Sequence, residues 1–173
     1  MDRVGQRGAR TDRYGCRARR STEGRGIVTN LPPVLAEIRE DFLSLEHPER
    51  LQLLLEFADD LPEMPARLAD HPELQERVVE CQSPVYIVLE VNDGIVTMHA
   101  TAPPEAPTTR GFASILAQGI SGLEVEEMLA IPDDFPQTIG LTQAVSPLRI
   151  AGMTGMLLRA KRQVRAIVAA NEH

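Results

Sequence analysis

The chain has 173 residues, of which 43% are hydrophobic and only 3% are aromatic, so its core is expected to be mainly aliphatic. This length fits one domain with a core of its own. No segment approaches the roughly 18 consecutive apolar residues that a membrane-spanning helix needs, so we predict no membrane association. Two cysteines are too few for a disulfide framework, and they favour a reducing, cytoplasmic compartment.

The formal net charge of −7 is unevenly distributed. Residues 1–27 contain eight arginines and three acidic residues, a balance of +5, which leaves −12 on the rest of the chain. An acidic body does not suit binding to a phosphate backbone, so we predict no nucleic-acid partner. It does suit docking onto a basic protein surface.

The N-terminal segment, residues 1–27, is rich in Arg and Gly and has few periodic apolar residues. Such a composition cannot offset the entropy of ordering, so we expect a disordered extension, or a start-site artefact, before a folded domain over residues 28–173. The segment lacks the apolar stretch of a secretory signal, so we do not interpret it as one. Its arginines leave two alternatives, a nucleic-acid-binding arm and an organelle transit peptide. Cys16 lies here, and we interpret it as incidental.

The first part of the domain is predicted to be helical. Apolar residues at three- and four-residue spacing predict a helix over residues 31–45, and Pro48 then begins a second helix. Two prolines make residues 61–65 a loop, and the mixed residues 66–75 are expected to be irregular. The expected buried face of the second helix consists of Leu51, Leu54, Leu55 and Ala58.

A sheet is predicted in the middle of the chain. Val78-Val79 is expected to form a short strand, and residues 85–91 form a β-branched and apolar run. Asn92-Asp93-Gly94 is a strong hairpin signal, because these residue types accept positive φ. Residues 95–101 alternate apolar and polar side chains as a half-buried return strand. Three short antiparallel strands are therefore expected.

Helices follow the sheet. Thr108 or Thr109 is expected to cap a helix that runs to Ile120, after a proline-rich linker. Shorter helical segments are expected over residues 125–129 and 133–139. Ser146 is a good N-cap residue with Pro147 at the first helical position of a long final helix. The order of helices, short strands and helices indicates an α+β fold.

The sequence lacks the motifs of common catalytic and metal sites. The four histidines are scattered, and none has a zinc-site spacing to a cysteine, so we predict no metal site. A glycine-rich phosphate loop and a nucleophile elbow are absent as well. His99 lies on a predicted strand and could face Cys81 in space, although a structural role is the simpler interpretation.

Cys81 remains as the candidate for chemistry. A lone cytoplasmic cysteine is most often a small buried hydrophobe. Here polar residues flank the thiol at a junction between elements, which favours exposure and chemistry. The neighbouring Glu80 would raise the pKa of the thiol, so a strongly activated nucleophile is not expected. A thiol that accepts a group when a partner supplies the activation fits these residues better.

The stretch from Val79 to Tyr86 resembles the SufE family of cysteine desulfuration proteins, which carry Gly-Cys-Gln-Ser ahead of an apolar strand with an aromatic residue. The resemblance spans roughly residues 31–168. Its further motifs follow in order: the loop Leu61-Pro62 with Met64-Pro65, the hairpin Asp93-Gly94, Arg110-Gly111 ahead of a helix, and the segment Ser146 to Met153. Glu80 replaces the family's Gly, Tyr86 its Trp and Ala151 its Asn.

The resemblance implies a two-layer α+β fold of the SufE/IscU type, with a three-stranded antiparallel sheet packed with helices. It implies a sulfur acceptor and activator of a SufS-type cysteine desulfurase in iron–sulfur cluster assembly. Cys81 would carry persulfide sulfur to a scaffold complex. The pyridoxal phosphate would belong to the desulfurase, so this chain needs no cofactor and is not itself an enzyme.

The resemblance also assigns supporting roles. Gln82 and Ser83 are expected to hold the loop through side-chain hydrogen bonds. Arg149 either orients the loop or the partner, or it caps or pairs with a carboxylate, and Arg110 is interpreted as structural. Two other functions remain open, namely a non-covalent adaptor that regulates the desulfurase and a thiol redox sensor.

Overall fold

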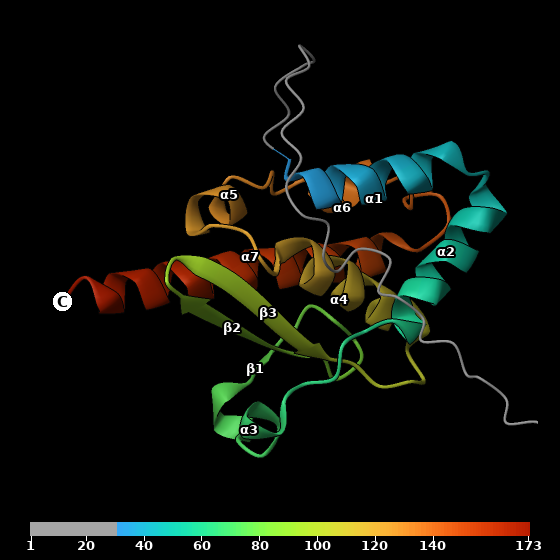
Figure 1. Ribbon diagram of the computed structural model, residues 1–173. Helices are drawn as coiled ribbons and strands as arrows, with labels where there is room; N and C mark the ends of the chain where they lie inside the picture. Colours follow the sequence, from blue (N-terminus) through green and yellow to red (C-terminus); the bar gives the residue numbers. More distant parts are fainter. Residues whose placement is uncertain (1–30) are drawn as a thin grey trace, which may run out of the picture.

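The computed structural model of the chain describes residues 31–173 (Figure 1). The expected N-terminal extension, residues 1–27, and Cys16 within it lie outside the described residues. The elements in chain order are α1 (Pro33–Ser44), α2 (His47–Asp59), α3 (Ala66–Ala69), the 3-10 helix η1 (Pro72–Leu74), β1 (Glu76–Arg77), β2 (Tyr86–Asn92), β3 (Ile95–Thr101), α4 (Pro107–Ile120), α5 (Val125–Leu129), α6 (Phe135–Thr138) and α7 (Pro147–Asn171).

The three strands form one antiparallel sheet in the order β1-β2-β3. The hairpin between β2 and β3 turns at Asp93 and Gly94, whose φ angles are 51° and 77°. These positive values are what the Asn-Asp-Gly signal predicts. In the register of the hairpin Leu89 pairs with Met98, and both side chains are buried in the core.

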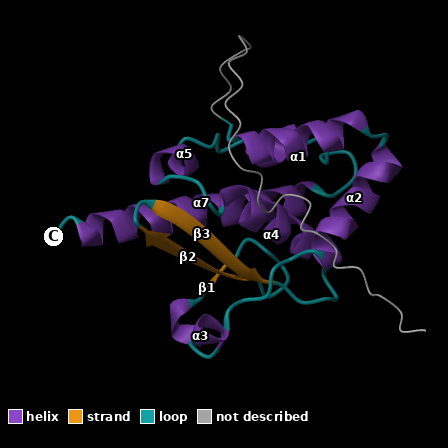
Figure 2. Ribbon diagram, in the orientation of Figure 1, coloured by secondary structure: helices purple, strands orange, loops and turns teal. Residues whose placement is uncertain are grey.

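One face of the sheet is covered by helices (Figure 2). α7 packs against β2 and α4 against β3, and α1 and α2 pack on α4. The core between these elements contains few aromatic residues, and Phe42 of α1 stacks on Phe57 of α2 with ring centroids 5.9 Å apart. The prediction of an α+β fold with a three-stranded antiparallel sheet packed with helices is confirmed.

The first strand is displaced from its predicted position. β1 comprises Glu76–Arg77, and Val78-Val79 already belongs to the following loop. The backbone N–H of Cys81 donates to the carbonyl of Val78 at 3.2 Å, which turns the chain away from the sheet. Val78 is buried whereas Val79 is 68% exposed, so the valines do not pack as a strand pair.

Two helical predictions need correction. Residues 66–75, expected to be irregular, contain α3 and η1. In α2 the buried residues are Leu53, Leu54, Phe57 and Ala58. Of the predicted buried face, Leu51 is exposed and Leu55 is only half-buried. Leucines at 51, 53, 54 and 55 allow several apolar stripes, and packing against α4 selects one of them.

The start of α4 also differs from the prediction. α4 begins at Pro107 with Ala106 as its N-cap residue, so neither Thr108 nor Thr109 caps it. Arg110-Gly111, predicted to precede a helix, lies inside α4. Arg110 donates from Nε to the carbonyl of Ala58 and from Nη1 to that of Ala102, which agrees with a structural role.

The long helix α7 connects the sheet to the candidate site. It begins at Pro147 after Ser146, as predicted, although Ser146 makes no side-chain capping hydrogen bond. None of the helices in residues 31–173 is long and apolar enough to cross a membrane.

Candidate functional site

Cys81 lies in the loop that joins β1 to β2. The backbone N–H of Val78 donates to the carbonyl of Val85 at 2.9 Å and closes this loop. Among the described residues Asp93 is the only non-glycine with positive φ. Glu80, where the motif that the loop resembles has a glycine, therefore does not adopt a left-handed backbone, and the loop accommodates a side chain at this position.

Cys81 is only 8% exposed. Its sulfur points toward α7, where an added Cβ at Gly152 would stand 3.0 Å from Sγ. The thiol is also part of the hydrophobic core cluster. The expectation of an exposed thiol is therefore wrong, because the polar residues around Cys81 do not keep its side chain in solvent.

Burial of the thiol raises the pKa of Cys81 to about 11, and the negative charge of Glu80 adds to this effect. The guanidinium of Arg159 acts in the opposite direction. The predicted influence of Glu80 is confirmed, and burial is the larger cause. At neutral pH Cys81 is a protonated thiol and a weak nucleophile.

Glu80 and Glu76 are both bound by Arg159 of α7. Arg159 donates from Nε and Nη2 to the two oxygens of Glu80 at 2.8 and 3.0 Å, and from Nη1 to Glu76 at 2.7 Å. Arg162 also donates to Glu76. Gln163 links Glu76, at 2.8 Å, to the backbone N–H of Leu89. The segment leading into Cys81 is thereby fixed to α7 and to the sheet.

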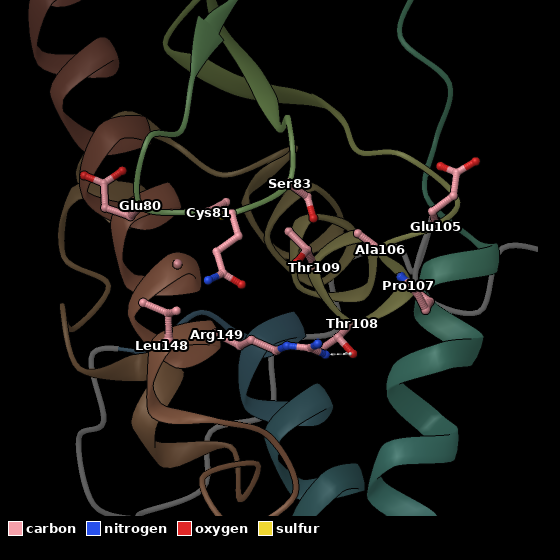
Figure 3. A pocket seen from close by; sticks show the side chains of 12 residues that line it. Glu80, Cys81, Ser83, Glu105, Ala106, Pro107, Thr108, Thr109, Leu148 and Arg149 are labelled. Carbon is pink, nitrogen blue, oxygen red and sulfur yellow. Dashed lines mark hydrogen bonds between the residues drawn. The ribbon is translucent and has the colours of Figure 1, made fainter.

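A cleft of about 270 Å³ opens beside Cys81 (Figure 3). Its walls are the Cys81 loop, the first turns of α4 and the start of α7. Arg149 lines it and donates from Nη1 to the hydroxyl of Thr108 at 2.9 Å. Arg149 thus spans from α7 to α4 beside the loop. Glu105 lies at the far end of the cleft from Glu80.

Gln82 and Ser83 line the same cleft. Their side chains make no hydrogen bond to other residues in the described part of the chain, so the expected side-chain support of the loop is wrong. Backbone hydrogen bonds and the Glu80 ion pair hold the loop instead. All five predicted site residues, Cys81 and the supporting Glu80, Gln82, Ser83 and Arg149, are brought together around one cleft.

His99 does not belong to this site. Its Nε2 lies 2.8 Å from Oε2 of Glu90. Along β3, His99 alternates with the core-facing Met98, so it lies on the other face of the sheet. No group of three or more His, Cys, Asp or Glu residues that could hold a metal ion occurs within residues 31–173.

Sequence reasoning missed three residues around Cys81, namely Glu76, Gly155 and Arg159. The sequence does contain a signal for this surface of α7. Gly152, Gly155 and Arg159 follow one another at three- and four-residue spacing and therefore share one face of the helix.

Comparison with known proteins gives the same family that the loop motif resembles. The family model of SufE, described as an Fe-S metabolism associated domain, matches residues 36–164. An uncharacterised SufE-like protein of Mycobacterium tuberculosis is 47% identical over 137 residues, which cover 79% of this chain and 94% of the relative. One of Synechocystis is 31% identical over 123 residues, covering 70% of this chain and 74% of the relative.

Similarity extends to a plant protein and to a solved structure. SufE-like protein 1, chloroplastic/mitochondrial, of Arabidopsis thaliana is 29% identical over 75% of this chain, but only 34% of its own length is matched. The solution structure of a hypothetical protein from Thermus thermophilus superposes with a TM-score of 0.71 at 37% identity, covering 80% of this chain and 98% of the other. The chain belongs to the SufE family, whose domain is associated with iron–sulfur metabolism.

Proposed function

We propose that this protein accepts sulfur from a cysteine desulfurase and carries it on Cys81 to a scaffold for iron–sulfur cluster assembly. The observation that carries the proposal is the position of Cys81, the free cysteine of the described residues, in a loop beside a cleft. Family membership supplies the link to iron–sulfur metabolism.

The transfer is a thiol exchange. The Cys81 thiolate attacks the outer sulfur of a persulfide on the desulfurase, and a new S–S bond forms on Cys81. The bond between the two sulfurs on the partner breaks, and the partner's cysteine leaves as a thiolate. No net oxidation or reduction occurs. The proton lost by Cys81 is transferred to the partner or to solvent.

The buried state of Cys81 implies that docking precedes transfer. The thiol of a residue that is only 8% exposed, with a pKa of about 11, neither reaches the partner's sulfur nor ionises readily at neutral pH. The loop must therefore open when the partner binds. Two exposed apolar side chains, Val79 in the loop and Leu148 beside it in α7, are suited to such a contact.

Partner, cofactor and compartment follow from this proposal. The pyridoxal phosphate that releases sulfur from cysteine resides on the SufS-type desulfurase, and the present chain contributes the acceptor thiol without a cofactor of its own. It acts as a covalent carrier and activator in the cytoplasm, and not as an enzyme with its own turnover. A scaffold complex is the proposed recipient.

Mass spectrometry after incubation with a desulfurase and cysteine tests the proposal. The peptide containing Cys81 is expected to gain about 32 Da for each sulfur atom bound. Cys81→Ser should abolish this gain and the stimulation of desulfurase turnover while keeping the fold. Cys16→Ser, the matched control at the other cysteine, should behave like the native protein.

Two outcomes would overturn the carrier role. The first is an absence of sulfur on Cys81 while the desulfurase turns over. The second is full stimulation by Cys81→Ser, which would make the protein a non-covalent adaptor of the desulfurase.

A further inference from the structure

We propose that Glu80 is a positioning residue that holds the Cys81 loop closed against α7 until a partner opens it. This inference rests on the proposed function, because it concerns how the acceptor thiol is released. We call the contact of Glu80 with Arg159 and Gly155 the Glu80 latch.

The latch and the thiol occupy one stripe of α7. Gly152 lies against the sulfur of Cys81, Gly155 lies against the side chain of Glu80, and Arg159 binds the carboxylate of Glu80. Residues at this spacing share one face of a helix. Glu80 and Cys81, which are consecutive in the loop, are therefore held by one surface of the helix. Because they are adjacent in the chain, Cys81 cannot move away from Gly152 unless Glu80 moves as well.

Gly155 is necessary for this contact. A Cβ at position 155 would stand 2.8 Å from Cγ and Cδ of Glu80 and 2.9 Å from its Cβ. The absence of a side chain lets Glu80 lie flat on the helix and reach Arg159 with both oxygens. A glycine inside a helix lowers helix stability relative to alanine. At position 155 the close contact with Glu80, which only a glycine permits, offsets this loss.

Arg159 holds both ends of the segment that leads into Cys81. It binds Glu76 in β1 and Glu80 next to the thiol, and the Glu76 end is reinforced by Gln163 and Arg162. The Glu76 end is tied to the sheet, whereas Glu80 is held on the helix by Arg159. The loop can therefore open at Glu80 while its root at Glu76 stays in place.

The exposure of the pair suits a releasable contact. The Glu80 side chain is 39% exposed and that of Arg159 is 17% exposed. Water and salt compete for such a partly exposed bidentate pair, so its rupture does not require unfolding of the domain. The latch therefore keeps the thiol buried at rest and still allows a docking partner to release it.

The test measures release of Cys81 in the protein without a partner. Iodoacetamide alkylation reports access to the sulfur, and hydrogen exchange of the peptide over residues 78–85 reports loop opening independently of the thiol's ionisation. All variants carry Cys16→Ser, so that Cys81 is the sole reactive thiol. Exchange of the β2–β3 hairpin serves as an internal reference for the intact fold.

Four substitutions separate the latch from the charge of Glu80. Glu80→Asp keeps the charge but shortens the side chain by one methylene, and Gly155→Ala keeps every charge but displaces the Glu80 side chain. Glu80→Gln removes the charge. Glu105→Gln, the matched control, removes a charge at the other end of the cleft.

We expect Glu80→Asp and Gly155→Ala to raise both the alkylation rate and the loop exchange rate about five- to tenfold, with Glu105→Gln unchanged. The proposal of a Glu80 latch is overturned if Glu80→Gln is the only substitution that accelerates alkylation, because Glu80 would then act through its charge alone. It is equally overturned if loop exchange in Glu80→Asp and Gly155→Ala matches the native rate.

A second arm keeps the two proposals apart. With desulfurase and cysteine present, the latch variants are expected to acquire sulfur on Cys81 faster than the native protein. If the native protein acquires none while the desulfurase turns over, the carrier function fails, and the partner-free alkylation and exchange rates still decide the latch.

Discussion

Gly152 of α7 lies directly against Cys81, so closely that a Cβ at this position would stand 3.0 Å from the sulfur. A helical glycine is unfavourable by about 0.5–1 kcal/mol relative to alanine. Its presence here is explained by the space that the buried thiol requires. The resting position of Cys81 is therefore set by the backbone of a helix that lies more than sixty residues away in sequence.

Gly152→Ala is expected to push the Cys81 loop outward and to accelerate alkylation of the thiol. The gain in helix propensity offsets the loss of packing, so the free energy of unfolding should change by less than about 1 kcal/mol. Alkylation rates and urea denaturation measure the two quantities. Gly119→Ala is the control, because its Cβ would collide with Leu35 in the core, away from the loop. Gly119→Ala should lower the free energy of unfolding, whereas Gly152→Ala should not.

The alkylation rate of Cys81 should keep rising with pH well above neutrality. A thiol with a pKa of about 11 is only about one part in a thousand ionised at pH 8, and this fraction grows about tenfold per pH unit. In Cys16→Ser protein the rate should therefore not level off below about pH 10. The same protein unfolded in urea should level off near pH 9. A plateau at pH 9 in the folded protein would contradict the raised pKa.

Glu90 should contribute to stability in a manner that acid abolishes. Hydrogen bonds from Arg67, followed by those from His99, outweigh burial and lower the pKa of Glu90 from 4.5 to about 2. A lowered carboxyl pKa stabilises the folded state above pH 4.5, and this stabilisation disappears as the pH falls through about 2.

Glu90→Gln should accordingly lower the free energy of unfolding by about 1–2 kcal/mol at pH 5.5, a value reduced for the solvent exposure of Arg67. The difference from the native protein should approach zero near pH 2. Urea denaturation at both pH values measures it. Glu63→Gln, at an exposed position outside this ion pair, is the control and should leave the free energy of unfolding at pH 5.5 within about 0.5 kcal/mol of the native value.

Lys161 should be important for stability although it is remote from the cleft. Its side chain is buried, and Nζ donates to the carbonyl of Ile131 and to Asp133, the latter at 2.6 Å. Lys161→Met should lower the free energy of unfolding by about 1–3 kcal/mol, because it leaves that carbonyl without its lysine donor. Asp133→Asn should have a smaller effect, since Asp133 is 66% exposed. Equal stability of Lys161→Met and native protein in urea denaturation would contradict this assignment.

Much of the fold is encoded in local sequence. Asn92-Asp93-Gly94 predicts the hairpin because these residues accept the positive φ that the turn requires, and Pro48 and Pro147 mark helix starts because their missing N–H is not needed there. The start of α4 is harder to predict from the sequence. Thr108 is a good N-cap residue by type, but it lies inside the helix, and its hydroxyl accepts a hydrogen bond from Arg149. Local propensity does not reveal such a competing partner.

The sequence by itself determined the candidate thiol, its family motif and the direction in which Glu80 shifts its pKa, because these depend on residues adjacent along the chain. Only the tertiary structure decided that Cys81 is buried and that Glu80 is bound by Arg159, 79 residues further on. The physical reason is that burial and ion pairing depend on which elements pack together. Polar neighbours in sequence favour exposure of a side chain, but the packing of the loop on the glycines of α7 overrides that preference.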